Sequence, residues 1–266
     1  MTTRRPVSIG AVGYLNARPL TWALDRDPER WQVRYDVPSV CASLLHSGDV
    51  DLGLVPLIEY LAAPDSKLVP GVGIGSRGRV ASVAIFTRVP VTSIRRLALD
   101  TSSRTSAALV RVLCHHRFGI APEFVAHGPD LQAMTREADA ALLIGDPALE
   151  TDPAPLGLQK IDLGEEWRAM TGLPFVYAAW CGRAGAVSGG DVAALQAAQA
   201  EGVRETGAIA SEYGRGDAAR TARAAAYLRH NVRYGLGPDE AKGLQLFLDC
   251  AADLGLAPLK RTLEFF

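Results

Sequence analysis

The polar residues that could bind or transform a small molecule fall in four short segments of the chain. Three of them follow runs that we predict to be strands: Gly13–Leu20, Asp100–Ser106 and Ile144–Ala148. The fourth segment contains Ser82, within the apolar run Val80–Thr87. In open α/β sheets, ligands lie beyond the carboxyl ends of the strands. These segments therefore predict a ligand site that is assembled from several strand ends.

The densest segment combines hydroxyl side chains with the start of a predicted helix. Ser103, Thr105 and Ser106 lie there beside Arg104. Free backbone N–H groups at a helix N-terminus attract anions, and an arginine can add charge-assisted hydrogen bonds to a carboxylate. The alternative is an ordinary helix cap with a solvated arginine. One cap does not need so many hydroxyls, so the segment favours substrate binding by these four residues.

Asn16, Asp146 and Ser82 each allow two interpretations. Asn16 can cap the following helix, which the local sequence favours because asparagine is common at caps, or its amide can face the ligand. Asp146 can cap the next turn or bind a ligand hydroxyl. A serine in an apolar run usually bonds to the backbone, whereas in a strand that crosses between two lobes it can project into the space between them. The residues alone leave these alternatives open.

Other patterns point to no chemistry. The segment Gly73–Gly78 matches GxGxxG, but a β-rich run follows it, whereas the dinucleotide fingerprint needs a helix there. A glycine-rich turn between strands is sufficient. His115 and His116 are adjacent, so on a helix they point about 100° apart and cannot easily share a metal ion. The other histidines are isolated and no GxSxG motif occurs, so we expect neither a metal site nor covalent hydrolase chemistry.

Strand-like and helix-like runs alternate along most of the chain. We expect strands at Val7–Val12, Val33–Asp36, Asp51–Val55, Val80–Thr87, Leu97–Asp100, Glu123–Ala126, Ala140–Ile144 and Phe175–Cys181. We expect helices near Ala17–Leu24 and near Leu131–Glu137, and at Ser39–His46, Ser103–Arg117, Asp191–Tyr213, Ala218–Val232 and Pro238–Leu254. This alternation is typical of βαβ units and a mostly parallel sheet.

The elements form two similar α/β sets that are joined by two extended crossings. This arrangement predicts a two-lobed α/β protein with a ligand cleft between the lobes. We assign residues 1–88 and 179–266, including the C-terminal helices, to the first lobe and residues 89–178 to the second. A single doubly wound domain is the alternative.

The composition argues against several kinds of partner. Of the 266 residues, 48% are hydrophobic and 21% are charged, as in an ordinary folded protein. The 28 basic and 29 acidic residues give a net charge of −1, whereas proteins that bind nucleic acid or membrane surfaces normally have a basic excess. The four cysteines are far apart, and no export signal or membrane-spanning run is visible. We expect a cytoplasmic protein with a small-molecule substrate and no nucleic-acid or membrane partner.

Several stretches, taken in order, resemble the chorismate dehydratase family: Tyr14–Leu20, Ser102–Ser106, Leu143–Asp146, Glu166–Trp167 and Thr171–Tyr177. The likeness covers most of residues 7–182. It implies a periplasmic-binding-protein-like fold of the two-lobed type II kind. It also implies dehydration of chorismate to 3-[(1-carboxyvinyl)oxy]benzoate, at the start of the futalosine route to menaquinone, without a metal or organic cofactor. Family positions transfer catalytic roles to Asn16 and Ser82 and a substrate-anion role to Ser103–Ser106.

Two other functions stay open beside this one. The same fold suits a cytoplasmic protein that binds a small acid without catalysis, because a fold does not determine function. The sibling 1,4-dihydroxy-6-naphthoate synthase acts on cyclised dehypoxanthine futalosine. That family typically opens with a Ser-Pro-Cys-Pro-Asn-Asp-like stretch, where this chain has Gly13–Asn16, which favours the dehydratase.

The motifs contain no obvious histidine or glutamate that could act as the general base. One hypothesis is that the enolpyruvyl carboxylate of the substrate removes the C3 proton, while Asn16 and Ser82 orient the reacting groups. A protein base is the alternative, and Asp100, Asp146 and His127 are the residues to test for it.

Overall fold

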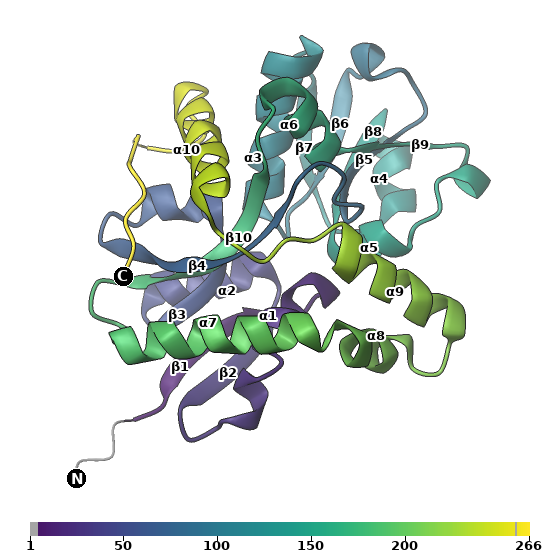
Figure 1. Ribbon diagram of the computed structural model, residues 1–266. Coiled ribbons are helices and arrows are strands. Elements are labelled where there is room, and N and C mark those ends of the chain that lie inside the picture. The colour runs from purple at the N-terminus through teal and green to yellow at the C-terminus, as the bar shows by residue number, and fades with distance from the viewer. Residues whose placement is uncertain (1–4, 259) are drawn as a thin grey trace.

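The computed structural model describes residues 5–258 and 260–266, and apolar strands form the sheet of its first lobe (Figure 1). These strands are β1 (Val7–Val12), β2 (Trp31–Asp36), β3 (Leu52–Pro56), β4 (Ser66–Ser76) and β10 (Phe175–Arg183). Their order is β2-β1-β3-β10-β4, in which β1 is parallel to β2 and β3, and β10 is antiparallel to β3 and β4. Residues 1–4, which we assigned to this lobe, lie outside the described residues.

A second sheet forms the core of the other lobe. Its strands are β5 (Val83–Thr87), β6 (Arg96–Asp100), β7 (Glu123–His127), β8 (Ala140–Ile144) and β9 (Gln159–Asp162). Their order is β7-β6-β8-β5-β9, with β6 parallel to β7 and β8, and β5 antiparallel to β8 and β9. Every residue of β5 and β8 is buried, which explains why these strands read as continuous apolar runs.

The chain crosses between the lobes twice. It leaves the first sheet after β4 at Ser76, enters the second sheet at Val83, and returns through β10 from Phe175. Because β10 pairs with β4, the end of β4 at Ser76, where the chain leaves the first sheet, lies beside Phe175, where the chain returns. Strand β5 therefore belongs to the second sheet, where both of its edges are paired, and not to the first lobe. The expected division at 178/179 falls inside β10.

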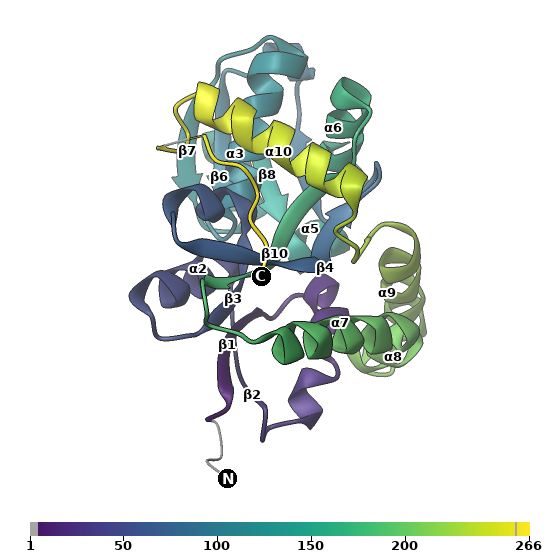
Figure 2. The same cartoon turned by 60° about the vertical axis from the view of Figure 1, so that its left-hand side comes forward.

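Helices cover both sheets. They are α1 (Arg18–Thr21), α2 (Pro38–Ser47), α3 (Arg104–Leu113), α4 (Leu131–Glu137), α5 (Gly145–Glu150), α6 (Leu163–Thr171), α7 (Gly189–Arg204), α8 (Thr206–Gly214), α9 (Ala218–His230) and α10 (Pro238–Asp253). Helices α3 to α6 lie with the second lobe, and α7 packs against α1 on the first (Figure 1). We expected α10 on the first lobe as well. It contacts both lobes, because it packs against β10 and the 3₁₀ segment Leu57–Ala62 of the first lobe and against α3 of the second (Figure 2).

Two local expectations are wrong. Gly73 and Gly75 belong to β4 and not to a turn between strands. A Cβ atom on Gly75 would lie 2.7 Å from the carbonyl oxygen of Phe175, so glycine allows β10 to pass close by. The helix expected over Asp191–Tyr213 is two helices, α7 and α8, because Glu205 leaves helical geometry with φ −89° and ψ 13°.

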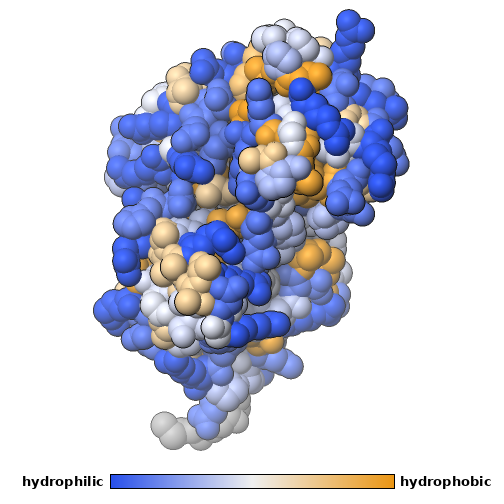
Figure 3. Space-filling model, turned by 90° about the vertical axis from the view of Figure 1, so that its right-hand side faces the viewer, coloured by the Kyte–Doolittle hydropathy of each residue, from blue (hydrophilic) through white to orange (hydrophobic). Residues whose placement is uncertain are grey.

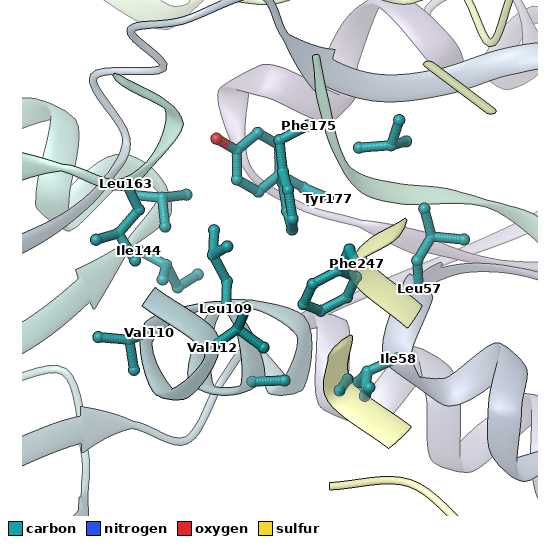
Figure 4. Close-up of a cluster of buried hydrophobic side chains, with 14 of the residues drawn as sticks. Leu57, Ile58, Leu109, Val110, Val112, Ile144, Leu163, Phe175, Tyr177 and Phe247 are labelled. Atoms are coloured by element: carbon teal, nitrogen blue, oxygen red, sulfur yellow. The ribbon is translucent and has the colours of Figure 1, made fainter. Parts of the chain in front are cut away.

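One apolar core extends across both lobes (Figure 4). Leu57 and Ile58 of the first lobe belong to the same cluster as Leu109 of α3. Phe247 of α10 lies edge-on to Phe175 of β10, with their ring centroids 4.9 Å apart. Burial of a shared core favours an arrangement in which the lobes lie close together.

The surface has no large apolar area on the face that Figure 3 shows. Hydrophilic residues cover most of this face, and its hydrophobic residues form small separate groups. The most exposed large hydrophobic side chains are dispersed along the chain: Tyr35, Val37, Leu156, Val203 and Leu246. Of the helices in the described part of the chain, none has the length and hydropathy needed to cross a bilayer.

Candidate functional site

A partly open cavity lies between the two lobes. Its wall consists of residues from both sheets and from the connections between them: Val12, Tyr14, Asn16, Pro38, Pro56, Ile74, Val80, Ser82, Val83, Ser103, Ser106, Ile144, Gly145, Tyr177 and Ala178. Within the described residues, no Asp, Glu, His, Lys or Arg side chain lines it. The polar part of the wall is therefore made of neutral hydroxyl and amide groups. We call these lining residues the cavity wall.

Asn16 lies on the cavity wall in a single 3₁₀ turn, Leu15–Ala17, directly after β1. It does not cap a helix, although the local sequence favours that role. Tyr14 is the N-cap of the turn and Ala17 is that of α1, and neither helix start has a side-chain cap. The Asn16 Oδ1 atom is buried and has no hydrogen-bond partner among the described residues. Since a buried acceptor without a partner is costly, this oxygen is available to a ligand donor.

Ser82 is the last residue of the connection between β4 and β5, and it is 1% exposed. Its Oγ accepts a hydrogen bond of 2.7 Å from the hydroxyl of Tyr227 on α9. The backbone N–H of Gly145 donates to the Ser82 carbonyl at 2.8 Å. The Ser82 side chain therefore faces the cavity rather than bonding to its own backbone, which was the common alternative for a serine in an apolar run.

The start of α3 supplies two further hydroxyls to the cavity wall. Ser103 is the N-cap of this helix, and its Oγ accepts from the backbone N–H of Ser106 at 3.4 Å. The two serine Oγ atoms lie 3.1 Å apart, and both side chains are buried. Capping and ligand contact are thus compatible here, because an N-cap side chain lies at the same helix end as the free N–H groups that attract an anion.

Arg104, Thr105 and Asp146 do not lie on the cavity wall, although we expected them to bind the substrate. Arg104 Nη1 lies 2.9 Å from the Glu59 Oε1 atom, and Thr105 Oγ1 accepts from the backbone N–H of Ile58 at 3.1 Å. The Asp146 Oδ1 atom accepts from the backbone N–H of Leu15 at 3.0 Å. Each bond joins the second lobe to the first.

These polar contacts form part of a larger set between the lobes, which we call the interlobe seam. It also contains the bond from the Ser39 N–H to the Ser102 carbonyl, at 3.1 Å. On the α8–α9 side, Glu150 accepts from the Tyr213 hydroxyl at 2.6 Å and pairs with Arg220 at 2.7 Å. The seam therefore holds the two lobes together around the cavity.

Two aromatic residues of the cavity wall were not singled out from the sequence as site residues. A Cβ atom on Gly145 would lie 2.9 Å from the ring of Tyr14, so the glycine, with φ +65°, makes room for this ring. The Tyr177 hydroxyl lies 3.2 Å from Ser76 Oγ. Both tyrosines fall in stretches that carry the family resemblance, which is the sequence feature that could have identified them.

Two carboxyl groups lie close behind the cavity wall: Asp100 is buried and Asp146 is partly buried. Burial raises the pKa of Asp100 and of Asp146 above the ordinary aspartate value. Asp100 accepts hydrogen bonds from the N–H and hydroxyl of Ser102, at 2.9 and 2.6 Å, and from the N–H of Ile144. Both carboxyl groups thus already hold backbone in place. Among the described residues, no group of histidine, cysteine and acidic side chains has the arrangement of a metal site.

Comparison with known proteins assigns the chain to a family. A family model described as menaquinone biosynthesis matches residues 7–253. The chain belongs to this menaquinone biosynthesis family. A curated chorismate dehydratase of Thermus thermophilus is 32% identical over 275 residues, covering 96% of this chain and 98% of that protein. The matched region includes the whole cavity wall.

Solved structures confirm the periplasmic-binding-protein-like fold. Protein AF1704 from Archaeoglobus fulgidus has a TM-score of 0.75 at 17% identity, with 95% of this chain and 98% of that chain covered. The periplasmic aliphatic sulphonate binding protein SsuA from Escherichia coli has a TM-score of 0.65 at 19% identity, with 97% and 90% covered. At such identities the likeness concerns the fold alone.

Proposed function

We propose that this protein is a cytoplasmic carbon–oxygen hydro-lyase that converts chorismate to 3-[(1-carboxyvinyl)oxy]benzoate and water, in the futalosine route to menaquinone. The relationship to a chorismate dehydratase supports this substrate. The observation that supports it most strongly within the chain is the buried, unpartnered Oδ1 atom of Asn16 on a wall of neutral donors. Three buried free thiols, Cys41, Cys114 and Cys181, suit a reducing compartment.

Asn16 is suited to hold the hydroxyl that leaves the ring. With its two carboxylates ionised, chorismate has one O–H donor, the hydroxyl at C4. This group is the natural partner for an amide oxygen that lacks one. The Asn16 amide can also donate an N–H bond to the same oxygen as its bond to carbon breaks, which lowers the cost of its departure as water. Asn16 thus recognises the reacting group and assists its loss.

The start of α3 is suited to hold one substrate carboxylate without a cation. Ser103 and Ser106 present hydroxyls there, and the first N–H groups of the helix carry a partial positive charge. Neutral donors of this kind stabilise an anion while leaving no strong counter-charge in the cavity. A carboxylate held through such groups retains enough basicity to accept a proton.

The substrate itself is the proposed base. The described cavity wall has no carboxylate or imidazole, which supports the enolpyruvyl carboxylate of chorismate as the proposed acceptor of the C3 proton. The C3–H electron pair forms the new ring double bond as the C4–O bond breaks, and the proton and hydroxide leave together as water. Aromatisation makes the reaction downhill, so the protein needs mainly to fix the reactive conformer.

Purified, chelator-treated protein incubated with chorismate tests this function. We expect protein-dependent loss of one water from chorismate, detected by liquid chromatography and mass spectrometry, and greatly reduced conversion by an Asn16→Ala variant. If chorismate binds but remains intact, the protein is a small-acid binding protein. If chorismate neither binds nor reacts, the next substrate to supply is cyclised dehypoxanthine futalosine, that of the sibling synthase.

A further inference from the structure

Ser82 on the cavity wall forms a buried pair with Tyr227, which lies behind the wall. They are separated by 145 positions in the sequence, and their hydroxyl oxygens lie 2.7 Å apart. Both residues are nearly inaccessible, at 1% and 3% exposure. Ser82 lines the cavity, whereas Tyr227 lies one layer behind it on α9, the helix that also lies against the turn containing Asn16. Among the described residues, Ser82 is therefore the hydrogen-bonded link between Tyr227 and the cavity.

The direction of this hydrogen bond determines where the Ser82 hydrogen can point. Tyr227 donates and Ser82 Oγ accepts, and burial raises the pKa of Tyr227, so the phenol stays protonated and remains a donor. A serine hydroxyl that accepts in this way must direct its own hydrogen elsewhere. Ser82 Oγ makes no other hydrogen bond within the described residues, and the open side is the cavity.

The backbone beneath Ser82 is fixed independently. Ala81 has φ +66°, a strained conformation for a residue with a side chain. The buried carboxylate of Asp162 holds this strained segment, because it accepts from the N–H groups of Val80 and Ala81 at 3.0 and 2.6 Å. The Ser82 carbonyl is held by Gly145. Because the backbone is held on both sides of Ser82, the main motion that remains is rotation of its hydroxyl group. The hydrogen bond from Tyr227 restricts this rotation.

We propose that Tyr227 is a positioning residue for the reaction: it fixes the Ser82 hydroxyl so that its hydrogen points at a substrate oxygen in the cavity. This inference rests on the proposed function. Without the tyrosine hydroxyl, the Ser82 hydroxyl can rotate so that its hydrogen points away from the cavity. The Ser82 oxygen then turns a lone pair toward the oxygen atoms of the substrate and no longer donates a hydrogen bond to them. A hydroxyl whose direction is already fixed lowers the barrier of the reaction, because it does not have to rotate as charge develops on the substrate.

Tyr227→Phe tests the role, and Tyr234→Phe is its matched control. Tyr234 is also a buried tyrosine, but its hydroxyl has no partner among the described residues and it does not line the cavity. We expect Tyr227→Phe to lower kcat about tenfold, as for one lost hydrogen bond, with a smaller change in KM. Tyr234→Phe should retain wild-type kinetics. Thermal unfolding of both variants verifies that they fold.

A double-mutant cycle separates this role from general packing. In a Ser82→Ala background, Tyr227→Phe should lower kcat no further, because its effect passes through the Ser82 hydroxyl. Wild-type kcat in Tyr227→Phe, an equal loss in Tyr234→Phe, or a full additional loss in the Ser82→Ala background each overturns the role while leaving the proposed function intact. A wild-type protein that leaves chorismate unchanged refutes both.

Discussion

The cavity wall and the interlobe seam surround the same space but are built from different chemistry. The described part of the wall presents neutral hydroxyl, amide and apolar groups. The seam, immediately outside it, contains ion pairs such as Arg104 with Glu59 and Arg220 with Glu150. Charged side chains of the seam thus join the two lobes, whereas neutral donors of the wall face the ligand. A dianionic substrate that must keep a basic carboxylate is better served by neutral donors than by a bound cation.

The first turn of α3 shows this division within a single helix. Ser103 and Ser106 are three positions apart and so lie on one face of the helix, toward the cavity. Arg104 and Thr105 lie between them in sequence and point to the first lobe, where they bond to Glu59 and to the backbone of Ile58. Helical geometry therefore divides one polar segment into a ligand-facing half and a lobe-joining half.

The largest effect is expected from a negative charge on the cavity wall. Asn16→Asp keeps the shape of the side chain but places a carboxylate beside a substrate that already has two, in surroundings of low dielectric. It also removes the only side-chain amide among the described residues of the wall. We expect kcat/KM for chorismate to fall about a thousandfold, measured from initial rates of product formation.

Asn231→Asp makes the same chemical change outside the wall. Asn231 lies at the end of α9 and donates to the carbonyl oxygen of Arg79. Asn231 is partly exposed and does not line the cavity, so this variant should stay within about twofold of wild-type kcat/KM although it loses the bond to Arg79. If Asn16→Asp were as active as this control, the neutral character of the wall would have no part in the reaction.

A smaller effect, on KM, should distinguish the residues of the first turn of α3 that face the cavity from those that face the first lobe. Ser106→Ala removes a buried hydroxyl from the wall, and we expect KM for chorismate to rise about tenfold. Arg104→Ala removes a half-exposed partner of the seam, so KM should change less than about threefold and the urea midpoint should fall slightly. The opposite ranking of the two KM values would mean that Arg104 binds the substrate, as its residue type alone indicates.

Sequence patterns predicted where helices and strands lie better than they predicted where side chains point. Helix α4 begins and ends at the predicted residues, because an apolar period and a capping Asp130 mark it locally. Helix α6 and the long strand β4 were not predicted, since glycine and proline interrupt the pattern of β4. The partner of Arg104 comes from the other lobe, and that of Ser82 lies 145 residues away. No local pattern reports such contacts.

The smallest expected effect concerns pH, and it tests whether the wall or the groups behind it supply the base. The ionisable side chains of the described wall are Tyr14 and Tyr177, and burial raises the pKa of both above the ordinary tyrosine value of about 10. Both hydroxyls are therefore neutral at lower pH. A substrate carboxylate that acts as base is already ionised near neutrality. We expect kcat/KM to vary less than about twofold between about pH 6 and pH 9.

A protein base behind the wall would give a different profile. Asp100 and Asp146 have raised pKa values, so if either removed the proton, activity would fall as pH decreases through that raised value and the carboxylate becomes protonated. Asp100→Asn and Asp146→Asn assign such an acidic limb to one residue, since the responsible variant would lose both the limb and most of the activity. A flat profile that persists in both variants leaves the substrate carboxylate as the base, consistent with a wall whose described groups do not titrate in this range.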